Sequence, residues 1–238
     1  MKINIYSDIH GRYNTFLELK KNAPKSQKEI FVGDLIHRGR NSVKMMEYIL
    51  KNNSNVVIGN HEALYLSYKG LRNKFLNNVS DATIKESKKI YLSANFGFDK
   101  DLNESKKDKL FIDDIDNFFI NLPIEINIDN IRITHAPPSI FLTKDSSEKD
   151  IYKYMFHRPN PLIQIKDKLS IFGHNGNYSF WTWNNGLAIE KDIIFKNKGN
   201  LGEYICIDSM KDYLSVITID TETLEYEITK IKGDQEWK

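Results

Sequence analysis

Ile3-Asn4-Ile5-Tyr6-Ser7-Asp8-Ile9-His10 is the stretch of sequence that decides the fold. Its first four residues read as a β-strand, and the chain then passes directly into polar residues. The same order continues beyond it, with helices predicted at 13–22 and 42–50 and strands at 29–32 and 55–58. Because strands that alternate with helices favour a parallel sheet, this βαβαβ order predicts an α/β fold.

The middle of the chain changes character at about residue 63. From there to about residue 121 the apolar spacing predicts helices at 64–68, 84–92 and 112–120, with polar connectors such as 99–109. We interpret residues 63–121 as a helical insertion in a single domain that covers residues 1–238. The rest reads mostly as strands, at 124–128, 131–134, 169–172, 203–208, 213–220 and 224–231, with a short further candidate at 181–183.

The composition is that of an ordinary globular protein. The 238 residues are 40% apolar and 28% charged, and the formal net charge is +2. This balance gives no electrostatic reason to expect nucleic acid or a membrane as the main partner. The one cysteine, Cys206, lies in an apolar run and is predicted to be a small buried side chain. Because no stretch approaches the roughly 20 apolar residues of a membrane span, we expect a cytoplasmic protein.

Five short polar motifs each follow an apolar strand. They contain Asp8 and His10, Asp34, Asn60 and His61, His135, and His174. Side chains at the carboxyl ends of adjacent strands in an open α/β sheet converge on one crevice. Imidazole, carboxylate and amide oxygen together suit divalent metals such as Mn, Fe or Zn. A shared carboxylate can hold two such ions about 3.5–4 Å apart, the spacing used for phosphoryl displacement.

Each motif taken alone also has a structural explanation. Gly33-Asp34 is most often a turn, and His135 alone is more often a hydrogen-bonded histidine at a strand end. The joint pattern is much more specific, because four of the six histidines fall at these strand ends in an order that builds one site. We therefore interpret the five motifs as one metal centre.

The motifs resemble those of the calcineurin-like metallophosphoesterases. The resemblance rests on Asp8-Ile9-His10-Gly11, on Gly33-Asp34-Leu35-Ile36-His37-Arg38-Gly39 and on Gly59-Asn60-His61-Glu62. It is closest to the phosphoprotein phosphatase branch, which includes Ser/Thr protein phosphatases and symmetrical diadenosine tetraphosphatases. Later motifs, Asn95-Phe96-Gly97 and Ile207-Asp208-Ser209, match in order and extend the likeness to about residue 220. The resemblance implies an α/β sandwich of two mixed sheets flanked by helices, with the insertion beside the metal site.

The resemblance also implies a role for each site residue. Asp8, His10 and Asp34 would hold the first metal ion, and Asp34, Asn60, His135 and His174 would hold the second, with Asp34 bridging. A bridging hydroxide would attack phosphorus, and His61 would protonate the leaving oxygen as a general acid. Arg38 and Arg158 would bind the phosphate; the alternative for Arg158 is a solvated loop cation. The implied cofactors are two divalent ions, with Mn²⁺ as first choice and Fe or Zn as alternatives.

One departure from the resembled pattern concerns the general acid. The protein phosphatases usually have an Asp where this chain has His37, and that Asp supports the general-acid histidine. The tetraphosphatases lack this Asp too, so that His37 favours them slightly or a separate subgroup. We expect His61 to lose its proton at lower pH beside His37 than beside a carboxylate.

Three functions follow from these observations. The first choice is a Ser/Thr-type phosphatase that acts on phosphorylated protein, and the alternative is a hydrolase of dinucleoside polyphosphates or capped nucleotides. The third is a catalytically silent binding module that kept the fold. The six intact metal positions argue against this third function.

Overall fold

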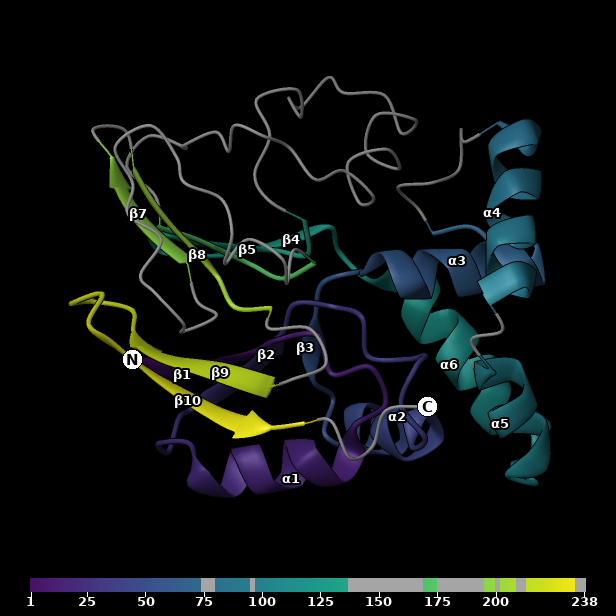
Figure 1. The fold of residues 1–238 in the computed structure, drawn as a ribbon, viewed down its shortest axis with the longest axis horizontal. Helices are drawn as coiled ribbons and strands as arrows, with labels where there is room; N and C mark the ends of the chain where they lie inside the picture. Colours follow the sequence, from purple (N-terminus) through teal and green to yellow (C-terminus); the bar gives the residue numbers. More distant parts are fainter. Residues whose placement is uncertain are drawn as a thin grey trace.

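Two mixed β-sheets packed face to face form the centre of the fold. The computed structural model describes residues 1–73, 80–94, 97–136, 169–174, 195–199, 202–208 and 213–233. Within them, the two sheets have the strand orders β10-β9-β1-β2-β3 and β4-β5-β6-β8-β7. Figure 1 shows α1 and α2 outside the first sheet and α3 to α6 together at one side of the molecule. The predicted sandwich of two mixed sheets flanked by helices is confirmed.

The first sheet is built on the predicted βαβαβ unit. Strands β1 (Lys2–Tyr6), β2 (Lys28–Phe31) and β3 (Asn55–Val56) are parallel, and α1 (Tyr13–Asn22) and α2 (Ser42–Lys51) connect them. The antiparallel strands β9 (Tyr213–Asp220) and β10 (Tyr226–Lys232) complete the sheet beside β1. The strand predicted at 55–58 is shorter than expected, because the Ile58 N–H donates to the carbonyl of Pro123 outside the sheet.

The second sheet comes from the later part of the chain. Strands β5 (Ile131–Thr134), β6 (Leu169–Phe172) and β8 (Gly202–Cys206) are parallel, and β4 (Glu125–Ile128) and β7 (Phe195–Gly199) pair antiparallel with β5 and β8. The sequence did not predict β7, because Phe-Lys-Asn-Lys-Gly has a single apolar side chain and no alternation. The candidate strand at 181–183 lies outside the described residues.

The core between the sheets is almost entirely aliphatic. Ile3 and Ile5 of β1 point into it, together with side chains of the second sheet such as Ile133 and Ile171. Alternate residues of a strand point to opposite faces, so Tyr6 instead joins the core beneath the helices. Each fully buried Ile contributes about 1.5–3 kcal/mol through the hydrophobic effect, which holds the two sheets together.

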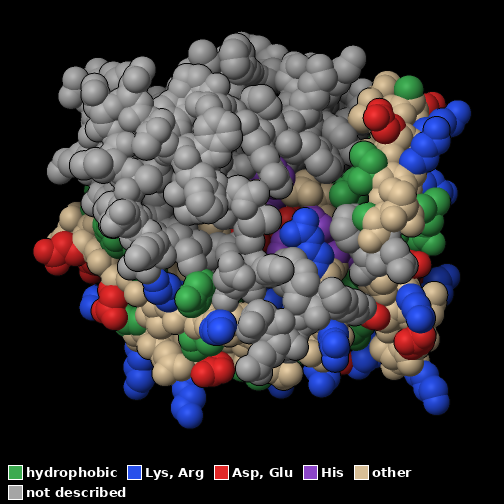
Figure 2. All heavy atoms as spheres, viewed as in Figure 1, with side chains coloured by type: hydrophobic (Ala, Val, Ile, Leu, Met, Phe, Trp, Pro, Cys, Tyr) green, Lys and Arg blue, Asp and Glu red, His purple; other side chains and the backbone are tan. Residues whose placement is uncertain are grey.

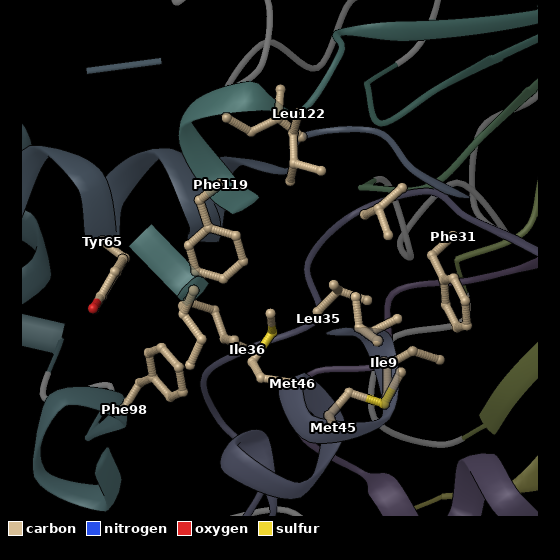
Figure 3. Close-up of a cluster of buried hydrophobic side chains, with 14 of the residues drawn as sticks. Ile9, Phe31, Leu35, Ile36, Met45, Met46, Tyr65, Phe98, Phe119 and Leu122 are labelled. Carbon is tan, nitrogen blue, oxygen red and sulfur yellow. The ribbon is translucent and has the colours of Figure 1, made fainter. Parts of the chain in front are cut away.

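Residues 60–121, which include the predicted insertion over 63–121, form four helices in the described part of the chain. They are α3 (Asn60–Lys69), α4 (Asp81–Ala94), α5 (Phe98–Glu104) and α6 (Lys109–Asn121). The prediction of a polar connector over 99–109 was wrong for α5, since Phe98 and Leu102 lie one helical turn apart and are both buried. Figure 3 shows Phe98 and Phe119 in the same core as Met46 of α2. These helices thus share one hydrophobic core with α2, which lies outside the first sheet.

Two smaller predictions concern single features of the chain. Cys206 is buried, as its apolar neighbours predicted. Among the helices of the described residues, none has the length and apolar character needed to cross a membrane.

Candidate active site

Polar side chains that follow the ends of six strands lie together at one edge of the sandwich. Asp8, Asp34 and Asn60 follow the carboxyl ends of the parallel strands β1, β2 and β3, and His135, His174 and Asp208 follow β5, β6 and β8. A pocket at this edge is lined by Asp8, His10, Asp34, Arg38, Asn60, His61, His174 and Asp208. Figure 2 shows histidine side chains, in purple, with basic side chains beside them near the middle of the face drawn.

Asp34 lies at the centre of the site. Its Oδ2 atom lies 3.6 Å from Nε2 of His10 and 3.8 Å from Nε2 of His61. Its other carboxylate oxygen, Oδ1, lies 3.4 Å from Nε2 of His135. The two oxygens of one carboxylate thus face two separate groups of imidazoles.

Two of the histidines are oriented by backbone carbonyls. Nδ1 of His135 lies 2.8 Å from the carbonyl oxygen of Val32, and Nδ1 of His10 lies 3.3 Å from that of Ile36. A carbonyl oxygen can only accept, so Nδ1 carries the proton and Nε2 offers a lone pair to the site. Oδ1 of Asn60 lies 2.9 Å from Nε2 of His135. When the His135 ring is neutral, both atoms present lone pairs, and a cation placed between them would bind both.

The donor atoms fit two divalent cations. The possible ligand atoms of His10, Asp34 and His61 lie within 4.8 Å of one another, and so do those of Asp34, His135 and His174. Donors on one ion with bonds of about 2.1 Å lie about 3–3.5 Å apart, close to the separations around Asp34. Nitrogen and oxygen donors without a thiolate suit Mn, Fe or Zn.

The structure groups the predicted ligands somewhat differently from the resemblance. His61, expected as the general acid, lies in the same group as His10 and Asp34. Asp8, expected on the first metal ion, has Oδ1 3.6 Å from Nδ1 of His135 and accepts a hydrogen bond from the backbone N–H of His174. Both contacts place Asp8 beside the group formed by Asp34, His135 and His174.

Burial and crowding perturb the titration of the site. The pKa of the Asp8 carboxyl is raised well above its usual value by burial first and then by the nearby Asp208 and Asp34. The pKa of His61 is lowered well below its usual value, chiefly by burial and then by His10 and His37. Neutral imidazoles can act as metal ligands, and a cation would relieve the repulsion between the carboxylates.

Several site residues occupy a backbone conformation that L-amino acids seldom adopt. The φ angles of His10, Asp34 and His174 are 51°, 51° and 65°. Each costs about 1–2 kcal/mol, so the surrounding contacts must hold these loops in place. Gly59 lies so close to Asp34 that a Cβ atom there would come within 2.3 Å of Oδ1, and this approach requires glycine.

Glu62 provides one of the contacts that hold the loops, although the sequence assigned it no role. Its buried carboxylate accepts backbone N–H groups from Asp34, Leu35 and Gly59 at 2.9, 2.9 and 3.0 Å. Burial, followed by the charge of Asp34, raises the pKa of Glu62 to about 7. Glu62 therefore ties the loop that carries Asp34 to the helix start that carries Asn60 and His61.

His37 contacts the predicted general acid directly. Its Nδ1 atom lies 2.8 Å from Nδ1 of His61. The ring of His37 also meets Tyr91 of α4 edge to face, with 5.1 Å between ring centroids. The insertion therefore packs against the partner of His61.

Of the two predicted phosphate-binding arginines, Arg38 lines the pocket and is partly exposed. Arg158 lies outside the described residues, as does most of the Asn95-Phe96-Gly97 motif. Asp208 also lines the pocket, although we predicted no role for it from the sequence. Its position just after an apolar strand is the same signal that identified the other residues.

Comparison with known proteins agrees with this architecture. The family model described as calcineurin-like phosphoesterase matches residues 1–201. A symmetrical bis(5'-nucleosyl)-tetraphosphatase of Buchnera aphidicola (subsp. Schizaphis graminum) is 32% identical over 39% of this chain and 36% of its own. The chain therefore spans well under half of that relative's length.

Solved structures share the fold over nearly the whole chain. A structure assigned as a diadenosine tetraphosphatase has a TM-score of 0.58 at 18% identity, covering 98% of this chain and 93% of its own. A Saccharomyces cerevisiae protein serine/threonine phosphatase with similarity to human phosphatase PP5 has a TM-score of 0.54 at 15% identity, covering 98% of this chain and 80% of its own. At such identities the likeness concerns the fold alone.

Proposed function

The chain belongs to the calcineurin-like phosphoesterase family, and from this premise we propose that it hydrolyses phosphate esters with two divalent metal ions that share Asp34. Membership makes it a metal-dependent phosphoester hydrolase; the two-ion centre and its ligands are our proposal. The observation that carries the proposal is the position of Asp34, whose two carboxylate oxygens face different groups of imidazoles. The other proposed ligands are Asp8, His10, Asn60, His135 and His174.

The metal ions are proposed to be Mn²⁺, with Fe or Zn as alternatives. Bound divalent ions supply a water nucleophile at neutral pH and neutralise charge on the phosphoryl oxygens. Structural zinc sites usually contain cysteine, and the proposed ligand set contains none. The nitrogen and oxygen donors therefore support a catalytic centre rather than a structural one.

The remaining polar side chains are assigned to the substrate. Arg38 at the pocket presents a planar fork that matches two phosphate oxygens, and Arg158 is proposed as its partner. His61 would give its Nε2 proton to the leaving oxygen. Its Nε2 atom points toward Asp34 at the centre of the site, while its Nδ1 atom contacts His37.

The proposed first substrate class is protein phosphorylated on serine or threonine. We propose that residues 1–238 form a single domain that acts in the cytoplasm. A specific observation favours a dinucleoside polyphosphate as the second candidate. His37 stands where protein phosphatases have Asp and tetraphosphatases do not, and a relative at 32% identity is named as a tetraphosphatase. Substrate choice depends on loops, which vary within one fold.

A direct comparison of substrates tests this proposal. The Mn²⁺-loaded chain is incubated with a phosphoserine peptide and, separately, with diadenosine tetraphosphate, and kcat/KM is measured for each. We expect the peptide to be preferred by about 10-fold or more, which corresponds to about 1.4 kcal/mol of transition-state binding. An inverted preference would assign the enzyme to nucleotides. The Asp34→Asn variant, purified in the same way, controls for a contaminating phosphatase.

A further inference from the structure

Arg12 is a buried cation beside the proposed metal centre. It is among the largest side chains of the described residues that are fully buried, with 1% of its surface exposed. Its Nη2–H group donates to the carbonyl oxygen of Asp8 at 2.7 Å, and its Nε–H group donates to that of Ile9 at 3.0 Å. Its Nη1–H group donates to the carbonyl oxygen of Tyr213, where β9 begins, at 3.2 Å.

We propose that Arg12 is a positioning residue for the metal ion bound by His10, because its guanidinium fixes the two peptide groups that precede that ligand. This inference rests on the two-metal centre of the proposed function. Arg12 does not touch the site from the pocket side and is absent from the residues that line the pocket. Arg12 instead acts on the site indirectly, by binding backbone carbonyls of the loop that follows β1.

The conformation of the loop explains why such a contact is needed. His10 has a φ of 51°, so the loop must hold a strained residue with its imidazole directed at Asp34. The carbonyl of Ile9 accepts the backbone N–H of Arg12 at 3.1 Å as well as its Nε–H group. Arg12 therefore fixes the orientation of the peptides on both sides of Ile9.

The contact to Tyr213 gives the loop an anchor outside itself. Strand β9 is the antiparallel neighbour of β1, and the Ser7 N–H already continues this pairing by donating to the carbonyl of Ser215 at 3.0 Å. The hydrogen bond from Arg12 to Tyr213 adds a further contact, which joins the loop after β1 to the start of β9. Gly233, the residue after β10, lies close to the guanidinium of Arg12, since a Cβ atom added to Gly233 would lie 2.8 Å from Nη1.

Arginine suits this position better than lysine. The guanidinium is planar and always charged, and it carries donors in a fixed fork that can serve three carbonyl groups at once. A lysine would keep the charge but lose the fork. Comparing the two residues therefore separates the effect of geometry from that of the buried charge.

The test is calorimetric titration of the metal-free chain of residues 1–238 with Mn²⁺. We expect wild type to bind two ions and Arg12→Met to weaken one binding step by about 10–100-fold, the usual effect of losing a group that orients a metal ligand. The other step should change by less than about threefold. Arg12→Lys should fall between wild type and Arg12→Met. At saturating Mn²⁺, kcat should stay near the wild-type value, while the Mn²⁺ concentration for half-maximal activity rises.

Two further variants keep the test decisive. Gly233→Ala presses on the guanidinium without removing it and should weaken the same step by a smaller factor, which still tests the inference if Arg12→Met does not fold. Arg72→Met, which removes an arginine paired with Asp81 on the insertion, should leave both steps unchanged. Equal weakening of both steps, or none, in the Arg12 and Gly233 variants would overturn the inference. A wild-type chain that binds no Mn²⁺ would instead overturn the proposed function.

Discussion

The Asp34→Asn variant should hydrolyse an aryl phosphate at least about 10³-fold more slowly than wild type and should lose metal from both proposed positions. Each oxygen of Asp34 faces a different group of imidazoles, so one substitution removes a charged ligand from both ions. Metal ions stabilise the transition state by several kcal/mol, and a loss of about 4 kcal/mol corresponds to about 10³-fold in rate. The measurement is metal content per chain together with kcat/KM.

The backbone of this variant should be preserved, because Asn adopts the left-handed conformation at φ 51° at least as readily as Asp does. The matched control is Asp129→Asn, which makes the same substitution at an exposed residue with φ 49°. The control should bind both ions with wild-type activity. Retention of one ion at full occupancy in Asp34→Asn would show that Asp34 does not bridge.

The His61→Ala variant should slow hydrolysis of phosphoserine by about 10²–10⁴-fold, the usual contribution of a general acid. An aryl phosphate should be affected much less, because its leaving group departs without needing the proton. The two substrates thus provide an internal control for damage to the site. An equal loss on both would assign His61 to metal binding, in line with its place beside His10 and Asp34.

The contact between His37 and His61 predicts a second effect on the same acid. His37 lies 2.8 Å from Nδ1 of His61, and its proximity is one cause of the lowered pKa of His61, after burial and His10. In His37→Asp an anionic neighbour would favour the charged imidazolium and raise that pKa. The protonated acid would persist to higher pH, so the alkaline limb of the kcat profile should move upward. A profile that does not move would show that residue 37 has no influence on the acid.

Much of the fold was predictable because its signals are local. The alternation of Ile3 and Ile5 with Asn4 and Tyr6 identifies β1 and its two faces, and the helix at 13–22 has the bounds of α1. Two elements, β7 and α5, were not predicted, for physical reasons. Strand β7 forms through backbone pairing with β8, which requires no apolar pattern, and α5 depends on one apolar pair, Phe98 and Leu102, within a polar segment.

The site was predictable in its ligands but not in its supports. Ligand residues stand at strand ends, where sequence order alone places them together. Glu62 accepts backbone N–H groups from the Asp34 loop, and Arg12 binds carbonyls of its own loop as well as that of the distant Tyr213. No residue pattern reports which carbonyl or N–H a buried side chain will reach. Asp208 had the signal of a polar residue after an apolar strand, but its place in the pocket emerges only from the packing of the second sheet.

The central claim is that hydrolysis depends on two metal ions held at these strand ends. The most direct measurement is aryl phosphate hydrolysis by the full chain after treatment with a chelator, followed by stepwise return of Mn²⁺ with metal analysis at each step. Activity should fall to background without metal and reach its maximum at two ions per chain. Full activity in the metal-free chain, or maximal activity with a single bound ion, would contradict the claim.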